Sequence, residues 1–209
     1  MHSKLCAKVL MALLLLFARM DARAQALPSA ETHRWPFAVG AGISGIDADA
    51  DPPTYRGAMG GISLWGEWYP ARLPATLHGL GLTTTLHDGF FSRSATLSSN
   101  FKQVTAGGGL IYQYPRWRSF RPYGKLMAEY ASIDFHFPNN SAYTHDSRNI
   151  LAYAAGADTR LRKHLWLRAD YEYQSWPMLF GTNHHPQIFS LGVMYRFSDP
   201  QPKHAGYMR

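Results

Sequence analysis

The chain has 209 residues, enough for one domain of any class, and 46% of them are hydrophobic. Its formal charge of +7 at pH 7 is not gathered into a basic run, so the composition gives no sign of a nucleic-acid-binding protein. Beyond residue 26 no stretch reaches 18 consecutive apolar residues, which excludes a transmembrane helix there.

Residues 1–26 have the layout of a cleaved secretory signal. Lys4 and Lys8 precede an apolar run over 9–17, and the small-residue sequence AQA follows at the end of the segment. The run is too short to span a bilayer. Cleavage after AQA removes Cys6 and so leaves no thiol chemistry and no disulfide. It also removes four cations and one acid, which lowers the formal charge from +7 to +4.

Eight later segments are predicted to be β-strands, because most of them alternate apolar and polar side chains. They cover 35–45, 57–69, 79–89, 103–114, 122–137, 149–161, 165–176 and 187–197. Short connections in PARLPATLH, PRWRSFRP and RKH take turns with longer polar ones at 46–56, 90–102, 138–148 and 177–186. This order is typical of a transmembrane barrel with tight periplasmic turns and longer outer loops. We therefore predict an all-β fold, an eight-stranded antiparallel up-and-down transmembrane β-barrel over 27–197, and a polar periplasmic tail over 198–209.

The seventh segment separates its two faces clearly. One face carries Leu167, Ala169, Tyr171 and Tyr173, and the other carries Arg168, Asp170, Glu172 and Gln174. The last segment likewise places Phe189, Leu191, Val193, Tyr195 and Phe197 on one face. We expect the apolar faces to contact lipid and the polar faces to line the lumen. The alternative is a secreted β-sandwich or a lipocalin-like soluble barrel.

Two segments depart from simple alternation. In 122–137 the apolar residues change parity, which implies a bulge near Ala131 and Ser132 or an extension beyond the membrane. In 57–69 both faces carry tryptophan, and Glu67 is placed inward because a charge facing mid-bilayer lipid costs roughly 2 to 4 kcal/mol. The glycines of 103–114 are expected to make room for large side chains from the opposite wall.

The lumen of an eight-stranded barrel is only wide enough for side chains, so charges inside it must be paired. A turn centred on Lys163 sets residues whose numbers sum to 326 opposite one another, which pairs Asp158 with Arg168 and Gly156 with Asp170. The predicted lumen charge network consists of Glu67, Lys125, Glu129, Asp158, Arg168, Asp170, Glu172 and Arg196. We expect it to plug the lumen and leave no continuous pore.

A second polar group is predicted near the outer mouth, where the sixth strand begins and the seventh ends. Its members are Arg56, His145, Asp146, Arg148, Gln174 and Trp176, and Glu172 is expected to approach the last four of them on the lumen side near the outer rim. This cluster is either a ligand site or a hydrogen-bonded plug that fixes the loops.

The spacing of RPYGKLMAEYASIDF, YTHDSRNILAYAAGADTRL, LWLRADYEYQSWP and LGVMYRF resembles a group of outer-membrane β-barrel proteins common in Acidobacteria-like genomes. That group lies within the OmpA/OmpX-like porin superfamily, and the likeness covers nearly the whole chain after the signal. The resemblance implies a fold and an outer-membrane location, without an activity. The polar tail SDPQPKHAGYMR departs from the pattern, since typical members end at the terminal aromatic.

The function expected from these features is a structural or surface-interaction role, without enzymatic activity, cofactor or bound metal. The expected partners are outer-membrane lipid, lipopolysaccharide and the barrel assembly machinery, with no nucleic acid, and the chain is expected to be a monomer. One alternative is a small-solute porin or channel. The other is a rim enzyme acting on lipid A.

Acyl transfer needs a histidine, a serine and a carboxylate in contact. The rim offers two sets of these residue types, His145, Asp146 and Ser147 in one loop and His184, His185 and Ser190 in the next.

Calcium loops use acids at the spacing of Asp47, Asp49 and Asp51, but Pro52 stands where such a loop needs glycine. Adjacent histidines in NHH have the residue type for a transition metal, although solvated loop histidines are commoner.

Overall fold

The computed structural model describes residues 37–47, 58–70, 73, 77–93, 100–114, 119–136, 144–179 and 182–197. All of them belong to one compact unit, Trp35–Arg209. The predicted signal over 1–26, the tail over 198–209 and Arg56 lie outside the described residues. Within the described residues, no helix is long and apolar enough to cross a bilayer.

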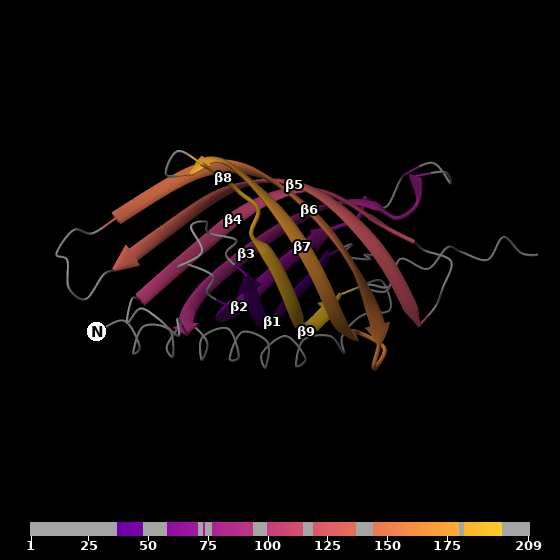
Figure 1. Cartoon of the computed structure of the whole chain (residues 1–209). Helices are drawn as coiled ribbons and strands as arrows, with labels where there is room; N and C mark the ends of the chain where they lie inside the picture. Colours follow the sequence, from indigo (N-terminus) through magenta and orange to yellow (C-terminus); the bar gives the residue numbers. More distant parts are fainter. Residues whose placement is uncertain are drawn as a thin grey trace, which may run out of the picture. The chain divides into compact units, whose positions relative to one another are not determined.

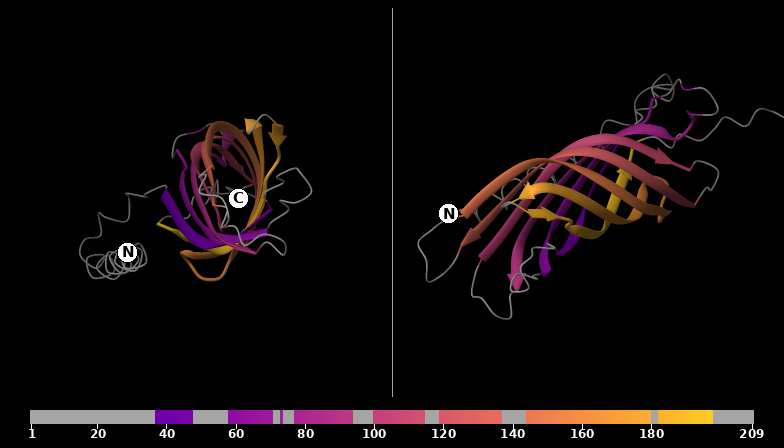
Figure 2. Two further views of the ribbon diagram at one scale, coloured as in Figure 1. Left: turned by 60° about the vertical axis from the view of Figure 1, so that its left-hand side comes forward. Right: turned by 45° about the horizontal axis from the view of Figure 1, so that its top comes forward.

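Antiparallel strands close on themselves and form a barrel (Figures 1 and 2). The barrel strands are β1 (Phe37–Asp47), β2 (Ala58–Trp68), β3 (Leu80–Arg93), β4 (Asn100–Gln113), β5 (Phe120–His136), β6 (Thr144–Arg160), β7 (Leu165–Leu179) and β9 (Gln187–Arg196). A short strand, β8 (Thr182–His184), pairs only with the end of β7. The pairings of β1 with β9 and of β6 with β7 close the ring. The predicted fold class, an eight-stranded antiparallel barrel, is confirmed.

The register fixes the geometry of the barrel. Following paired residues once around from Phe37 returns to β1 at Asp47, a shift of ten residues. With about 3.3 Å per residue and about 4.8 Å between strands, this shift tilts the strands by roughly 40° from the barrel axis. The β6–β7 hairpin has the predicted register, with Asp158 opposite Arg168 and Gly156 opposite Asp170.

Apolar side chains cover the outside of the barrel, and polar ones fill the inside. Along β7, Leu167 and Tyr171 are exposed, whereas Arg168 and Asp170 are buried. The other strands follow the same alternation, with exposed Leu64, Leu86, Leu110, Leu126, Leu151 and Leu191 on the outer face. This distribution is the reverse of a soluble barrel, where the large apolar side chains lie inside.

Two explanations were predicted for the parity change in 122–137, a bulge near Ala131 and Ser132 or an extension beyond the membrane, and the bulge is wrong. β5 pairs with both neighbours without a register shift, and the irregularity lies between Gly60 and Gly61 of β2. The apolar residues of β5 change parity because the lumen itself becomes apolar there. Ala131 and Ile133 point inward and are buried, whereas Leu126 on the opposite face is exposed.

The connections at the two ends differ less in length than predicted. We call the end with connections 48–57, 94–99 and 137–143 the outer end, and the end with 69–79, 114–119 and 161–164 the turn end. Strands occupy much of the segments predicted as outer loops, since β3 reaches Arg93, β6 begins at Thr144 and β7 reaches Leu179. β-pairing satisfies backbone groups that a loop would leave to water, so the ladders extend beyond the apolar band.

Glycines on the lumen face make room for the neighbouring strand, which corrects the prediction that they accommodate the opposite wall. A Cβ at Gly107 would collide with the backbone and side chain of Glu129 on β5. A Cβ at Gly156 would collide with the ring of Tyr123, its register partner on β5. Each glycine therefore lets a large side chain on the next strand lie across it inside the lumen.

Candidate functional site

Four charged side chains from four strands form an arginine cluster near the turn end: Glu67 of β2, Asp158 of β6, Arg168 of β7 and Arg196 of β9. Arg168 Nε donates to Asp158 Oδ1 at 2.8 Å, and Arg168 Nη2 donates to Asp158 Oδ2 at 2.9 Å. Arg168 also forms an ion pair with Glu67, and Arg196 pairs with Asp158. Two acids and two bases are thereby matched inside the lumen.

Aromatic rings surround the arginine cluster. The guanidinium of Arg168 lies 4.5 Å from the ring centre of Tyr123, and that of Arg196 lies 5.2 Å from the ring centre of Trp166. Tyr69, which follows β2, donates its hydroxyl to Glu67 Oε2 at 2.9 Å. Burial, and next the charge of Glu67, raise the pKa of the Tyr69 hydroxyl well above its usual value, so this group remains a donor. The rings fill the space beside the charges and exclude water from them.

A second group, the glutamate cluster, lies nearer the outer end and consists of His87, Glu129, Glu172 and Gln174. Gln174 Nε2 bridges the two acids, at 2.7 Å from Glu172 Oε1 and 3.1 Å from Glu129 Oε2. His87 Nε2 lies 3.2 Å from Glu172 Oε2. Thr85 donates its hydroxyl to Glu129 Oε1 at 2.6 Å. Between the two clusters, Lys125 forms an ion pair with Asp170.

All eight side chains predicted for the lumen charge network are therefore buried on the inner face. Five of them are acids and three are bases, so the predicted set by itself has a surplus of negative charge. Arg121 and His87 are among the buried basic side chains outside the predicted set, and they face the same lumen. Arg121 lies over the ring of Trp166 at 4.5 Å, and His87 contacts Glu172 as above. Arg121 and a protonated His87 raise the three predicted bases to five cations, which equals the five predicted acids.

The sequence carries a signal for His87, although the predicted network omits it. In β3, Thr83, Thr85 and His87 alternate with Leu82 and Leu86, and the structure buries the first three and exposes the two leucines. The parity that separates the faces of β7 thus applies to β3 as well. The alternation in the sequence is enough to predict that His87 and Thr85 point inward. It does not predict which residues of β5 and β7 they contact.

The structure divides the predicted outer-mouth cluster in two. Gln174 and Trp176 are buried, and Trp176 Nε1 donates to Gln174 Oε1 at 2.9 Å. Asp146 and Arg148 instead pair with each other at 3.6 Å at the outer end, and Arg148 donates to the carbonyl of Met178 at 3.4 Å. Asp146 and Arg148 stand opposite Ile133 and Ala131 of β5 in the register, and the approach of all members to one point remains a prediction.

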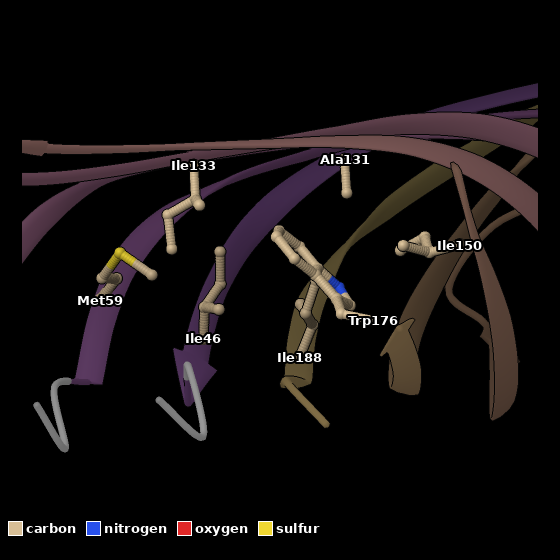
Figure 3. Packing of buried hydrophobic residues seen from close by; sticks show 7 residues of the cluster. All are labelled: Ile46, Met59, Ala131, Ile133, Ile150, Trp176 and Ile188. Atoms are coloured by element: carbon tan, nitrogen blue, oxygen red, sulfur yellow. The ribbon is translucent and has the colours of Figure 1, made fainter. Parts of the chain in front are cut away.

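An outer cap of seven buried side chains converges inside the outer end of the barrel (Figure 3). Its members come from six strands and are Ile46, Met59, Ala131, Ile133, Ile150, Trp176 and Ile188. Trp176 spans the space between the others and is fully buried. Apolar side chains thus gather inside the outer end of the barrel.

A sequence profile for the outer membrane protein β-barrel domain matches residues 10–197 of the chain. The chain belongs to this family. It is an outer-membrane β-barrel, as the apolar exterior and polar lumen indicate. The narrower Acidobacteria-like group remains a prediction.

Solved structures of outer-membrane barrels have the same fold. Neisserial surface protein A is similar with a TM-score of 0.59 at 16% identity, covering 78% of this chain and 99% of its own. OprG from Pseudomonas aeruginosa is similar with a TM-score of 0.56 at 16% identity, covering 79% of this chain and 98% of its own. Ail, the attachment invasion locus protein of Yersinia pestis, is similar with a TM-score of 0.53 at 17% identity, covering 78% of this chain and 99% of its own. A comparison with curated proteins finds no match.

One contact in the lumen has the residue types of an acyl-transfer site. Ser63 Oγ lies 2.6 Å from His87 Nδ1, and His87 Nε2 contacts Glu172. Ser63 also shares a hydrogen bond of 2.9 Å with Ser190. A nucleophile must reach an acyl carbon, and both Ser63 and His87 are fully buried among lumen side chains. These contacts form a chain of hydrogen bonds that joins β2, β3, β7 and β9.

The rim residues considered for acyl transfer have several contacts in the structure. His145 bonds Asp134 on the outside of the β5–β6 ladder, and Ser147 donates its backbone N–H to Asp146 at 2.8 Å. His184 is buried, whereas His185 stacks on Tyr173. Ser190 lies in the lumen instead of on the rim.

The metal hypotheses gain no support from the part of the chain that the structure describes. It contains no group of three or more histidine, cysteine or acidic side chains arranged to hold a metal ion. The two histidines of NHH differ in burial and contacts, so they do not act as a joint chelate. Asp47 is exposed at the end of β1, and Asp49 and Asp51 lie outside the described residues.

Proposed function

We propose that the protein is a non-conducting barrel with a structural or surface-interaction role. The observation that carries this proposal is the pairing of Arg168 with Glu67 and Asp158 at 0% side-chain exposure. An eight-stranded lumen is only wide enough for side chains, and here charged, aromatic and apolar layers follow one another along it. A hydrated ion crossing the lumen would have to break these pairs and displace the outer cap.

The outer end supports a role in contacts at the cell surface. β5 and β6 continue past the aromatic ring of Tyr130, and their outward side chains there are polar, including Ser132, Asp134 and Ser147. This paired ladder offers polar side chains for contacts at the cell surface. Among similar structures, one is named a surface protein and another an attachment invasion locus protein.

We further propose how the protein reaches the outer membrane and what it contacts there. Residues 1–26 act as a cleaved signal, so the processed chain begins near Leu27. The assembly machinery inserts the barrel, which contacts lipid and lipopolysaccharide as a monomer. Fractionation, N-terminal sequencing and the gel shift on heating test these points together. Recovery of the protein from the soluble periplasmic fraction would contradict them.

The main experiment measures conductance of the protein in a planar bilayer. Protein purified from outer membranes is first shown to be folded by its gel shift on heating, and a conducting porin reconstituted in the same way serves as the positive control. We expect no stable ohmic steps above the lipid background. Reproducible steps that scale with salt concentration would overturn the proposal and favour the small-solute channel.

The rim-enzyme alternative is tested separately, by mass spectrometry of lipid A from cells with and without the protein. We expect identical spectra, because the serine–histidine–glutamate contact is enclosed in the lumen. A change of acyl chains on lipid A that depends on Ser63 would instead assign catalysis to this contact.

A further inference from the structure

The outer rim of the barrel stands higher on one side than on the other. β5 and β6 pair with each other as far as Phe135 and Thr144, whereas β9 begins at Gln187. At a tilt of roughly 40° each row of paired residues climbs by about 3 Å from one strand to the next, which places Gln187 at about the height of Tyr130 on β5. From Tyr130 to Phe135 the β5–β6 ladder then rises by about 13 Å.

The outward side chains of this ladder change from apolar to polar above Tyr130. On β5 they run from Leu126 and Tyr130, which are 48% and 53% exposed, to the half-buried Ser132. On β6 they run from Leu151, which is 52% exposed, to the exposed Asn149. We call the polar outward face above Tyr130 on β4, β5 and β6 the polar wall. It consists of Lys102, Ser132, Asp134, His145, Ser147 and Asn149.

The polar wall continues the lipid-facing surface of the barrel upward. A lipid whose acyl chains contact Leu126 and Leu151 has its headgroup near the ring of Tyr130, at the foot of the wall. The headgroup layer of a phospholipid bilayer is only about 5 to 8 Å thick on each side. The wall is taller than this layer, so a lipid that covers it needs a larger polar head. At the cell-surface end of an outer-membrane barrel that lipid is lipopolysaccharide, whose head is a chain of sugars.

The hydrogen-bonding groups of the wall suit sugar hydroxyls. A serine hydroxyl and an asparagine amide can each donate and accept, as a sugar hydroxyl does. Ser132 lies opposite Ser147 in the register, and Asn149 lies opposite Tyr130, so these groups form two adjacent rows. The exposed ring of Tyr130 offers an apolar face to a sugar ring at the foot of the wall.

The charges of the wall are of mixed sign. Asp134 contacts His145 and is the register neighbour of Lys102. A carboxylate repels a phosphate but accepts hydrogen bonds from hydroxyls. The wall therefore favours the sugars of the lipid head over its phosphates.

We propose that the polar wall is a binding site for the core sugars of lipopolysaccharide. The acyl chains of the same molecule lie along Leu126 and Leu151, and Tyr130 packs against the sugar nearest the membrane. Ser132, Ser147 and Asn149 form hydrogen bonds with the sugars above it. The inference deepens the proposed contact with lipopolysaccharide and rests on the proposed surface role, in which the outer end faces the outside of the cell.

Competition between two lipids in nanodiscs, measured by native mass spectrometry, tests this site. Protein purified from outer membranes is placed in discs with equal amounts of lipid A and of lipopolysaccharide that has the same acyl chains and the inner-core sugars. The lipids that remain bound on release are identified. We expect the sugar-bearing lipid to be enriched. S132A/N149L removes hydrogen-bonding groups from both rows and should lower the enrichment by roughly 10- to 25-fold, or about three- to fivefold for each hydrogen bond lost.

Three matched variants separate recognition of sugars from other effects. S132T/N149Q keeps a hydroxyl and an amide at the two positions and should keep the enrichment within about twofold of the unchanged protein. T84V/T159V removes two hydroxyls from exposed outward positions below the wall and should leave the enrichment unchanged. K102Q removes a cation from the wall and should also leave it unchanged, since the sugars and not the phosphates are bound. Every variant is first checked for the gel shift on heating.

Equal enrichment in S132A/N149L and the unchanged protein would overturn the proposal. So would an equal loss in T84V/T159V, which would make the effect independent of the wall. Loss of the enrichment in K102Q with S132A/N149L unaffected would assign the binding to phosphates and reject the sugar site.

The orientation on which the site depends is tested separately in whole cells. The sequence has one cysteine, Cys6, which lies in the proposed signal. A cysteine introduced by Ser147→Cys should therefore be the labelled residue when cells are treated with a membrane-impermeant maleimide. Failure to label it would refute the proposed surface role, whereas the binding in nanodiscs tests the wall itself and depends on neither orientation nor conductance.

Discussion

Replacing Arg168 by alanine should destabilise the barrel more than any single change on its lipid face. Arg168 is completely buried and donates two hydrogen bonds to Asp158, while its ion pair with Glu67 holds a second acid. Its removal leaves both acids facing Arg196 as their remaining partner in the arginine cluster. Breaking a buried pair by removing one member costs about 3 to 5 kcal/mol, because the other charge stays desolvated.

The free energy of unfolding is measured by urea titration of the refolded protein in lipid vesicles, followed by tryptophan fluorescence. Leu167→Ala is the matched control, since Leu167 precedes Arg168 on β7 and faces outward. It should cost about 1 kcal/mol, the usual size for a change away from buried charge. A loss for Arg168→Ala no larger than this would refute the reasoning.

A second variant tests the cause of the loss. Adding Glu67→Gln to Arg168→Ala removes one of the two acids and leaves Asp158 paired with Arg196. If uncompensated charge causes the destabilisation, the double variant should recover at least about 1 kcal/mol. If lost packing causes it, the double variant should be no more stable than Arg168→Ala.

Three further changes have expected outcomes on the same assays. Gly156→Ala should lower the free energy of unfolding by about 1 to 3 kcal/mol, because its Cβ meets a tyrosine ring inside the lumen. Gly124→Ala is the control and should be nearly neutral, since a Cβ there has a single contact at 3.9 Å. Trp176→Ala should cost about 3 to 5 kcal/mol by emptying the outer cap, and Met178→Ala, at a side chain 61% exposed, should not. A chain ending before Tyr195 should fail to show the gel shift on heating, because β9 then loses residues that pair with β1 and β7 and the barrel stays open.

Local pattern alone determined the class of fold and most of the inward faces. Alternation with a period of two separates Arg168, Asp170 and Glu172 from Leu167 and Tyr171 in the sequence itself. A strand has only two faces, so once lipid is placed on the apolar face every residue of the other parity points inward. The four-residue turn at 161–164 also fixed the register of β6 and β7, because a short hairpin permits little slippage.

Alternation failed where the surroundings changed along a strand. The parity of Ile133 and Ala131 suggested a bulge, because nothing in the local pattern indicates that the lumen turns apolar near the outer end. That layer exists only when six strands bring side chains to the same height. Trp176 belongs to that layer, and on β7 it stands between Gln174 and Met178, whose carbonyl accepts from Arg148.

The partners inside the lumen were decided by tertiary structure. His87 and Glu172 are 85 residues apart in the chain, and Ser63 and Ser190 are 127 residues apart. Which of these side chains meet depends on the ten-residue shift accumulated around the ring, since it sets the relative heights of residues on opposite walls. The alternation of faces along one strand carries no information about that shift. The shift follows from the closure of all eight strands together. The sequence therefore determined which way each charge points, and only the closed barrel decided which opposite charge it finds.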